Sequence, residues 1–79
     1  MSPTIFRERG LRFFFFSREE PRMHVHVSSA SGEAKFWVEP TIALAMNRGL
    51  KQTEVRRAQR LIEERANEIR TAWRRHFGP

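Results

Sequence analysis

The two histidines His24 and His26 are the residues of this chain whose type and spacing most directly suggest chemistry. They lie one residue apart in the segment MHVHVS, where apolar and polar residues alternate. Alternation of this kind is typical of a β-strand, in which residues i and i+2 point to the same face. Two imidazoles that titrate near neutral pH and share one face of a sheet could act as an acid–base pair.

Such a pair would suit a metal-independent ribonuclease. One imidazole would deprotonate a ribose 2′-hydroxyl and the other would protonate the leaving oxygen, while Arg12, Arg22 or Lys35 would hold the phosphate. His24 and His26 are therefore the candidate catalytic residues. We nevertheless favour a non-enzymatic interpretation, in which the two histidines are polar residues of a contact surface.

A metal site is a second kind of chemistry that histidines can support. Two histidines on a strand supply two ligands, whereas zinc usually takes three or four, so Glu33 or His76 would have to complete the set. Nothing in the sequence places His76 near the pair, and the chain contains no cysteine. We therefore expect neither a metal nor another cofactor.

The chain is small and basic. Its 79 residues include 15 Lys and Arg against 9 Asp and Glu, which gives a formal net charge of +6. This length allows one domain over residues 1–79, with a core small enough that a partner or a second copy would stabilise it. Most of the cations are arginine, the side chain whose shape best fits carboxylates and phosphates. We therefore expect an acidic partner, either a protein or nucleic acid.

Neither a signal peptide nor a membrane span is recognisable in the sequence. The N-terminal segment MSPTIFRERG lacks a long apolar region, and the longest apolar run beyond it is FFFF. We therefore expect a cytoplasmic protein that does not associate with a membrane.

Hydrophobic periodicity predicts the fold. The first half of the chain alternates with period two and contains two hairpin signals and a short fifth segment, at about residues 4–16, 23–38 and 41–45, with a turn at residues 46–49. From Thr53 to Phe77 apolar residues recur every three or four positions, which predicts a helix with Thr53 as its N-cap. The expected class is α+β: a four- or five-stranded antiparallel meander (about residues 3–46) with one long C-terminal helix (about residues 52–77) on one face.

The predicted helix is too long for the predicted sheet. About 25 helical residues extend roughly 37 Å, whereas a six-residue strand extends about 20 Å. The helix must therefore kink, for instance near Ala66-Asn67, or overhang the sheet and present Trp73 and Phe77 to another molecule.

Cross-strand pairing in the second hairpin fixes which residues share a face. With Ser29 to Gly32 as the loop, His26 opposes Lys35 and His24 opposes Trp37, while the other face is wholly apolar. The same parity defines an outer face that carries Arg12, Phe14, Phe16, His24, His26, Lys35 and Trp37. Because one helix covers only one face of a sheet, we expect the outer face to be open to solvent or covered by another molecule.

The outer face and the end of the helix are the candidate binding surfaces. Aromatic rings beside cations could stack bases and neutralise phosphates, but Trp and Arg are also enriched in protein interfaces, which we favour. Arg74 and Arg75 lie in a segment without acids at the end of the helix and could also bind phosphate. The other helical arginines suggest a solvated face with i,i+4 pairs such as Arg60–Glu64.

The order of these motifs resembles the bacterial domain of unknown function 4160 family over essentially the whole chain. The resemblance lies in MSPTIFRERGLRFFFFSREE, HVHV, GEAKFWVEP, NRGL and AWRRHFG. The family usually has proline directly before the first histidine, whereas Arg22 and Met23 follow Pro21 here, and it commonly has Ser or Thr near the position of Lys51. The resemblance implies a small bacterial protein without an established activity, encoded beside another small protein in arrangements that look like toxin–antitoxin modules.

Together, these observations predict a component of a toxin–antitoxin-like module. It would bind a protein partner, either a cognate small protein or a second copy of itself, through the outer face. RNA or DNA would be a further ligand of the same face. The ribonuclease described above is the alternative, and the resemblance supplies no catalytic residue for it.

Overall fold

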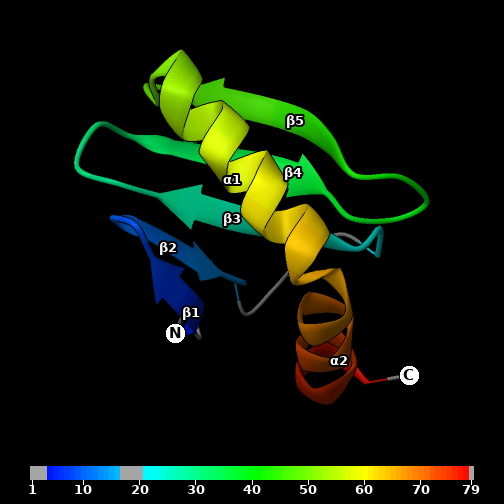
Figure 1. The fold of residues 1–79 in the computed structure, drawn as a ribbon. Helices are drawn as coiled ribbons and strands as arrows, with labels where there is room; N and C mark the ends of the chain where they lie inside the picture. Colours follow the sequence, from blue (N-terminus) through cyan, green and yellow to red (C-terminus); the bar gives the residue numbers. More distant parts are fainter. Residues whose placement is uncertain (1–3, 17–20, 79) are drawn as a thin grey trace.

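The computed structural model describes residues 4–16 and 21–78, which form a five-stranded sheet and two helices (Figure 1). The elements are β1 (Thr4–Glu8), β2 (Leu11–Phe14), β3 (His24–Ser28), β4 (Glu33–Trp37), β5 (Ala43–Arg48), α1 (Gln52–Glu64) and α2 (Ala66–Phe77). Each strand pairs antiparallel with its neighbour in sequence, so the order across the sheet is β1-β2-β3-β4-β5. The predicted α+β class and the five-stranded meander are confirmed.

The register of the β3–β4 hairpin is the one that the alternation predicts. His24 opposes Trp37 and His26 opposes Lys35 on one face, and Val25 opposes Phe36 on the other. The loop closes with a hydrogen bond of 2.9 Å from the amide of Ser29 to the carbonyl of Gly32. A one-residue slip would mix polar and apolar residues on each face, which is why the pattern determines the pairing.

The β1–β2 hairpin turns through two residues, Arg9 and Gly10. Their φ angles of 52° and 77° are both in the left-handed region, and Glu8 pairs with Leu11 on either side of them. Two-residue turns with positive φ at both positions match the right-handed twist of paired strands. As a result, the side chain of Arg9 is held at the tip of the hairpin.

The last strand lies later in the chain than the sequence suggested. Residues 41–45 were expected to form it and residues 46–49 to form a turn, but β5 extends through Arg48. The chain instead turns at Gly49, whose φ is 101°. The side chain of Asn47 closes it by accepting a hydrogen bond from the Leu50 amide (2.9 Å) and donating one to the Leu50 carbonyl (3.0 Å).

The helical segment is divided into two helices at Arg65. This residue has φ −114° and ψ 26°, outside the helical range, and it lies one residue before the predicted kink site Ala66-Asn67. α1 crosses the sheet and α2 continues past it in a different direction (Figure 1). The predicted kink is therefore confirmed, and it divides the expected long helix into two.

The core lies between α1 and the inner face of the sheet, the face opposite the histidines. Val55, Ala58 and Ile62 of α1 are buried there, as the predicted stripe requires. The fully buried strand residues that they join are Phe13, Val25, Val27, Ala34 and Phe36. No helix within the described residues is long and apolar enough to cross a membrane.

The first turn of α1 is held by Glu54. The helix begins at Gln52 with Lys51 at the N-cap position, so the predicted N-cap Thr53 is wrong. Lysine has no side-chain acceptor for the helix amides, but the carboxylate of Glu54 accepts a hydrogen bond of 2.9 Å from the amide of Lys51. This bond, followed by one from the side chain of Ser29 in the β3–β4 loop, lowers the pKa of Glu54 below its ordinary value of 4.5.

We expect the contribution of Glu54 to stability to depend on pH. Because its pKa is lower in the folded state, the contribution is fully present above the ordinary pKa and is lost as the pH falls through the folded value. Glu54→Gln should therefore lower Tm by a few degrees at neutral pH and have almost no effect at a pH below both values. Thermal unfolding followed by circular dichroism would test this, with Glu64→Gln as a control. An equal loss at both pH values would show that the charge of Glu54 is not involved.

The β3–β4 loop contacts the end of β5 at Gly32. A Cβ added to Gly32 would overlap the carbonyl oxygen of Arg48 and lie 2.9 Å from the Cα of Gly49. Both neighbours are backbone atoms, which cannot move aside without disturbing the turn that leads into α1. Only glycine fits at this position, and it keeps the loop, β5 and the start of α1 together.

Gly32→Ala should therefore lower the free energy of unfolding by about 1–3 kcal/mol, the typical cost of inserting a methyl group into a packed site. Urea denaturation of the purified protein would measure the change. Ala30→Ser is the matched control, because Ala30 is an exposed residue of the same loop. Equal midpoints for Gly32→Ala and the unsubstituted protein would show that the loop adapts to a side chain.

Candidate functional site

The outer face carries a continuous row of aromatic rings across β2, β3 and β4. The ring of Phe14 stacks on His26 with centroids 5.5 Å apart and planes inclined by 28°. His26 in turn contacts His24 edge to face at 5.1 Å, and His24 contacts Trp37 at 5.9 Å. Phe16 contacts His26 at 4.3 Å. The predicted pairing of the strands therefore brings these five side chains together.

Cations lie over the rings at both ends of this row. The guanidinium carbon of Arg12 is 4.3 Å from the centroid of Phe14, and its Nε donates a hydrogen bond of 2.7 Å to the Thr4 hydroxyl. At the other end, Arg22 lies 4.1 Å and Lys35 lies 4.5 Å from the ring of Trp37. Each such cation–π contact is worth about 0.5–1 kcal/mol at an exposed site.

The histidines of the row are buried, which corrects the expectation that they lie on an open surface. His24 is 0% exposed and His26 is 7% exposed. Part of the cover comes from α2, because Trp73 lies 5.3 Å from His24 and 5.4 Å from Phe15. The sequence predicted a kink, or an overhang that would present Trp73 to another molecule, whereas the bend at Arg65 turns α2 toward the end of the sheet and packs Trp73 within the chain.

Burial also determines what the histidines can do chemically. The Nδ1 of His24 lies 2.7 Å from the carbonyl oxygen of Arg22, so this nitrogen carries the proton and donates. With no exposed surface, His24 cannot meet a ribose hydroxyl in this conformation. The geometry thus gives the two imidazoles a packing role and does not favour the ribonuclease.

The residues considered for a metal site are not gathered. Within residues 4–16 and 21–78, no three His, Cys, Asp or Glu side chains come together as a possible metal site. Glu33 opposes Ser28 at the other end of β3 from His24. His76 stacks on Phe15 instead, with ring centroids 6.1 Å apart.

The remaining candidates differ in exposure and position. Phe16 is 40% exposed, while Arg12, Lys35 and Trp37 are half-buried, so these side chains form the accessible part of the outer face. Arg74 and Arg75 are exposed in the last turn of α2. Arg75 lines a groove with residues of β1, including Thr4, and is not part of the row of rings.

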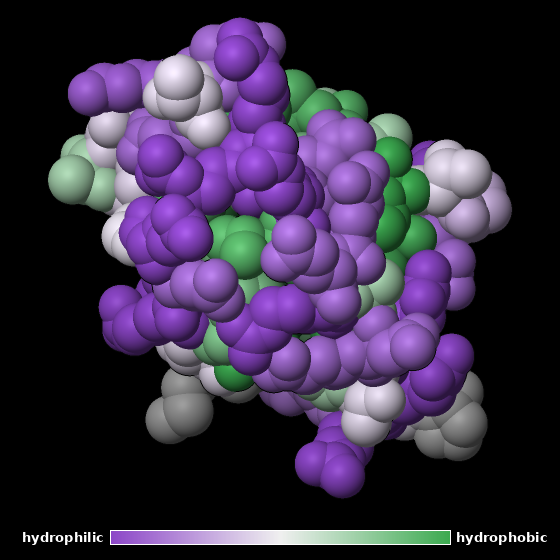
Figure 2. Space-filling model, in the orientation of Figure 1, coloured by the Kyte–Doolittle hydropathy of each residue, from purple (hydrophilic) through white to green (hydrophobic). Residues whose placement is uncertain are grey.

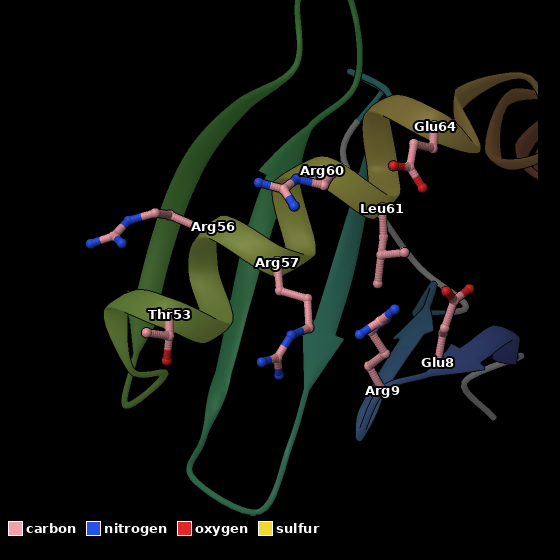
Figure 3. A pocket seen from close by; sticks show the side chains of 8 residues that line it. All are labelled: Glu8, Arg9, Thr53, Arg56, Arg57, Arg60, Leu61 and Glu64. Atoms are coloured by element: carbon pink, nitrogen blue, oxygen red, sulfur yellow. The ribbon is translucent and has the colours of Figure 1, made fainter.

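A second charged site was missed by the sequence reasoning. Arg9, at the tip of the β1–β2 hairpin, lines a groove of about 440 Å³ together with Arg56, Arg57 and Arg60 of α1 (Figure 3). The spacing of the three helical arginines was visible in the sequence, but it was interpreted as a solvated face. The position of Arg9 opposite α1 follows only from the packing of the hairpin against the helix.

One of the ion pairs expected on that face is absent. The described residues contain no Arg60–Glu64 contact within 4 Å, so this i,i+4 prediction is wrong. In Figure 3 the guanidinium of Arg60 points away from the end of α1 that carries Glu64.

The bend between the helices is fixed by Arg65. Its guanidinium donates to both carboxylate oxygens of Glu68 (2.8 and 3.0 Å) and to Glu8 of β1 (3.0 Å). It also lies 3.5 Å from the ring of Phe6. The hydrogen bond to Glu68, followed by the weaker effects of Glu8, raises the pKa of Arg65 above its ordinary value.

Replacing Arg65 should loosen the attachment of the helices to β1. Arg65→Met keeps the length of the side chain but removes the hydrogen bonds and the charge, and we expect a loss of about 1–2 kcal/mol. Arg65→Lys should keep only part of the stability that Arg65→Met loses, because lysine cannot form the bidentate contact with Glu68. A double-mutant cycle with Glu8→Gln, measured by urea denaturation, would isolate the contact with β1. Additive effects would show that Arg65 and Glu8 do not interact.

The chain is a small basic α+β protein with a meander sheet and two helices. It presents cations beside aromatic rings on one side and an arginine-lined groove on the other. A family model described as a domain of unknown function, DUF4160, matches residues 10–74. The chain belongs to this family, as the order of its motifs suggested. No curated protein and no solved structure gives a significant match to this chain.

Proposed function

We propose that this protein is a non-enzymatic binding component of a toxin–antitoxin-like module, and that its outer face contacts an acidic protein partner. The observation that supports the proposal most directly is the pair of cations over Trp37. A half-buried tryptophan with Arg22 and Lys35 over its ring has the composition of an interface hot spot.

The arrangement of the rings favours a protein over nucleic acid at this face. Base stacking requires the flat face of an aromatic ring to be free for the base. Cations already lie over Trp37 and Phe14, and Phe14 is only 3% exposed. Phe16 is 40% exposed and could instead insert its edge into an apolar pocket of a partner.

Charge supports an acidic partner rather than a second copy. Arg12, Arg22 and Lys35 surround the accessible rings, and the whole chain carries a net charge of +6. Two copies of a chain with this net charge would repel each other, whereas an acidic surface of a different protein would be attracted to it. The expected partner is a small cognate protein with an acidic contact surface, in the cytoplasm.

The proposal predicts that the outer face determines the affinity for a small acidic protein encoded beside this one, the partner that the family resemblance implies. Titration calorimetry with that protein should give a defined complex, and Trp37→Ala should weaken it by about 30-fold, the effect of losing a hot spot of about 2 kcal/mol. Lys35→Glu should also weaken binding because it reverses a charge that faces the partner.

Arg74→Glu is the matched control, since it makes a similar charge change on α2 and should leave the affinity nearly unchanged. Circular dichroism of each variant would verify that it folds. The proposal would be overturned if Lys35→Glu and Arg74→Glu behaved alike, or if sedimentation showed that the outer face joins two copies of this chain.

A further inference from the structure

We propose that the groove between α1 and the β1–β2 turn binds the phosphate backbone of a nucleic acid. This site lies on the helix side of the molecule, away from the outer face. It therefore adds a second ligand to the proposed function and does not depend on it. The space-filling view of this side is mostly hydrophilic around α1 (Figure 2).

The cations of the groove come from two elements that are far apart in the sequence. Arg57 extends from α1 and Arg9 from the hairpin tip into the gap between them, while Arg56 and Arg60 extend along the other side of the helix (Figure 3). Arg56 and Arg60 are one helical turn apart, about 6 Å along the axis. The four arginines thus form a band that runs from the groove around α1, with Arg9 and Arg57 in the gap itself.

The positive charge of this band is not neutralised within the described residues. None of the four arginines has a carboxylate of residues 4–16 or 21–78 within 4 Å. Of the two carboxylates that line the groove, Glu8 pairs with Arg65, and Glu64 makes no ion pair with the four arginines.

The lining of the groove distinguishes the class of ligand. Leu61 is the apolar residue among the described side chains that line it, and the others are the four arginines, Thr53, Glu8 and Glu64. The four cations outnumber the two carboxylates, and Glu8 is paired with Arg65. Protein interfaces have an apolar centre with few charges, whereas nucleic-acid interfaces are polar and strongly positive. Guanidinium groups also match the paired oxygens of phosphate. The surface therefore fits a phosphodiester backbone better than an acidic protein.

Fluorescence anisotropy over a salt series would test the site, with the full chain and short labelled probes of single-stranded RNA and duplex DNA. We expect Arg57→Gln/Arg60→Gln to weaken binding by about tenfold. It should also reduce the slope of log K against log salt by about 1.4 for RNA or about 1.8 for duplex DNA, the values for two lost phosphate contacts. Glutamine keeps a high helix propensity, so the doubly substituted protein should fold. Arg9→Asn should also weaken binding, and asparagine tolerates the left-handed conformation that this turn requires.

Arg74→Gln/Arg75→Gln is the matched control, because it removes the same charge from the exposed end of α2. If this control lost as much affinity as Arg57→Gln/Arg60→Gln, the proposal would be overturned, since binding would then follow net charge alone. Three other results would overturn it: no binding at low salt, equal affinity for polyglutamate, or complete competition by millimolar inorganic phosphate. The last would identify a site for small anions.

Discussion

The mismatch between the length of the helical segment and the size of the sheet determines how the helices are arranged in this structure. A straight helix through residues 52–77 would leave its last turns without a surface to cover, so the chain bends at Arg65. Arg65 fixes the direction of the bend because its guanidinium reaches Glu68, Glu8 and the ring of Phe6 together. The bend places Trp73 against His24 and closes the end of the sheet.

The two charged surfaces follow from this arrangement. On one side, α2 covers the end of the outer face where the histidines lie, so only the outer side chains of the row, such as Phe16 and Trp37, remain accessible. On the other side, α1 lies above the β1–β2 turn and brings its arginines opposite Arg9. The ion pair between Arg65 and Glu8 removes one of the carboxylates that could have neutralised that groove.

The parts of the fold that depend on neighbouring residues could be predicted from the sequence, and those that depend on distant contacts could not. Strict alternation determined the β3–β4 register because a slip would place polar residues in the core. The N-cap was misplaced because the Asn47–Leu50 turn, which is not a helix signal, sets where α1 begins. The burial of His24 and the position of Arg9 depend on where the helices lie after the bend, which periodicity does not encode.

The order of the strands has a kinetic consequence. Every strand pairs with its neighbour in the chain, so the sheet can assemble hairpin by hairpin with small loop-closure entropy, a topology associated with rapid folding. During synthesis, however, the apolar inner face is complete before α1 has been made. The nascent sheet therefore exposes Phe13, Val25 and Phe36 for as long as the helices take to follow. That interval is when the chain is most prone to aggregate, so its yield in a cell should depend on translation speed and chaperones more than on the stability of the finished fold.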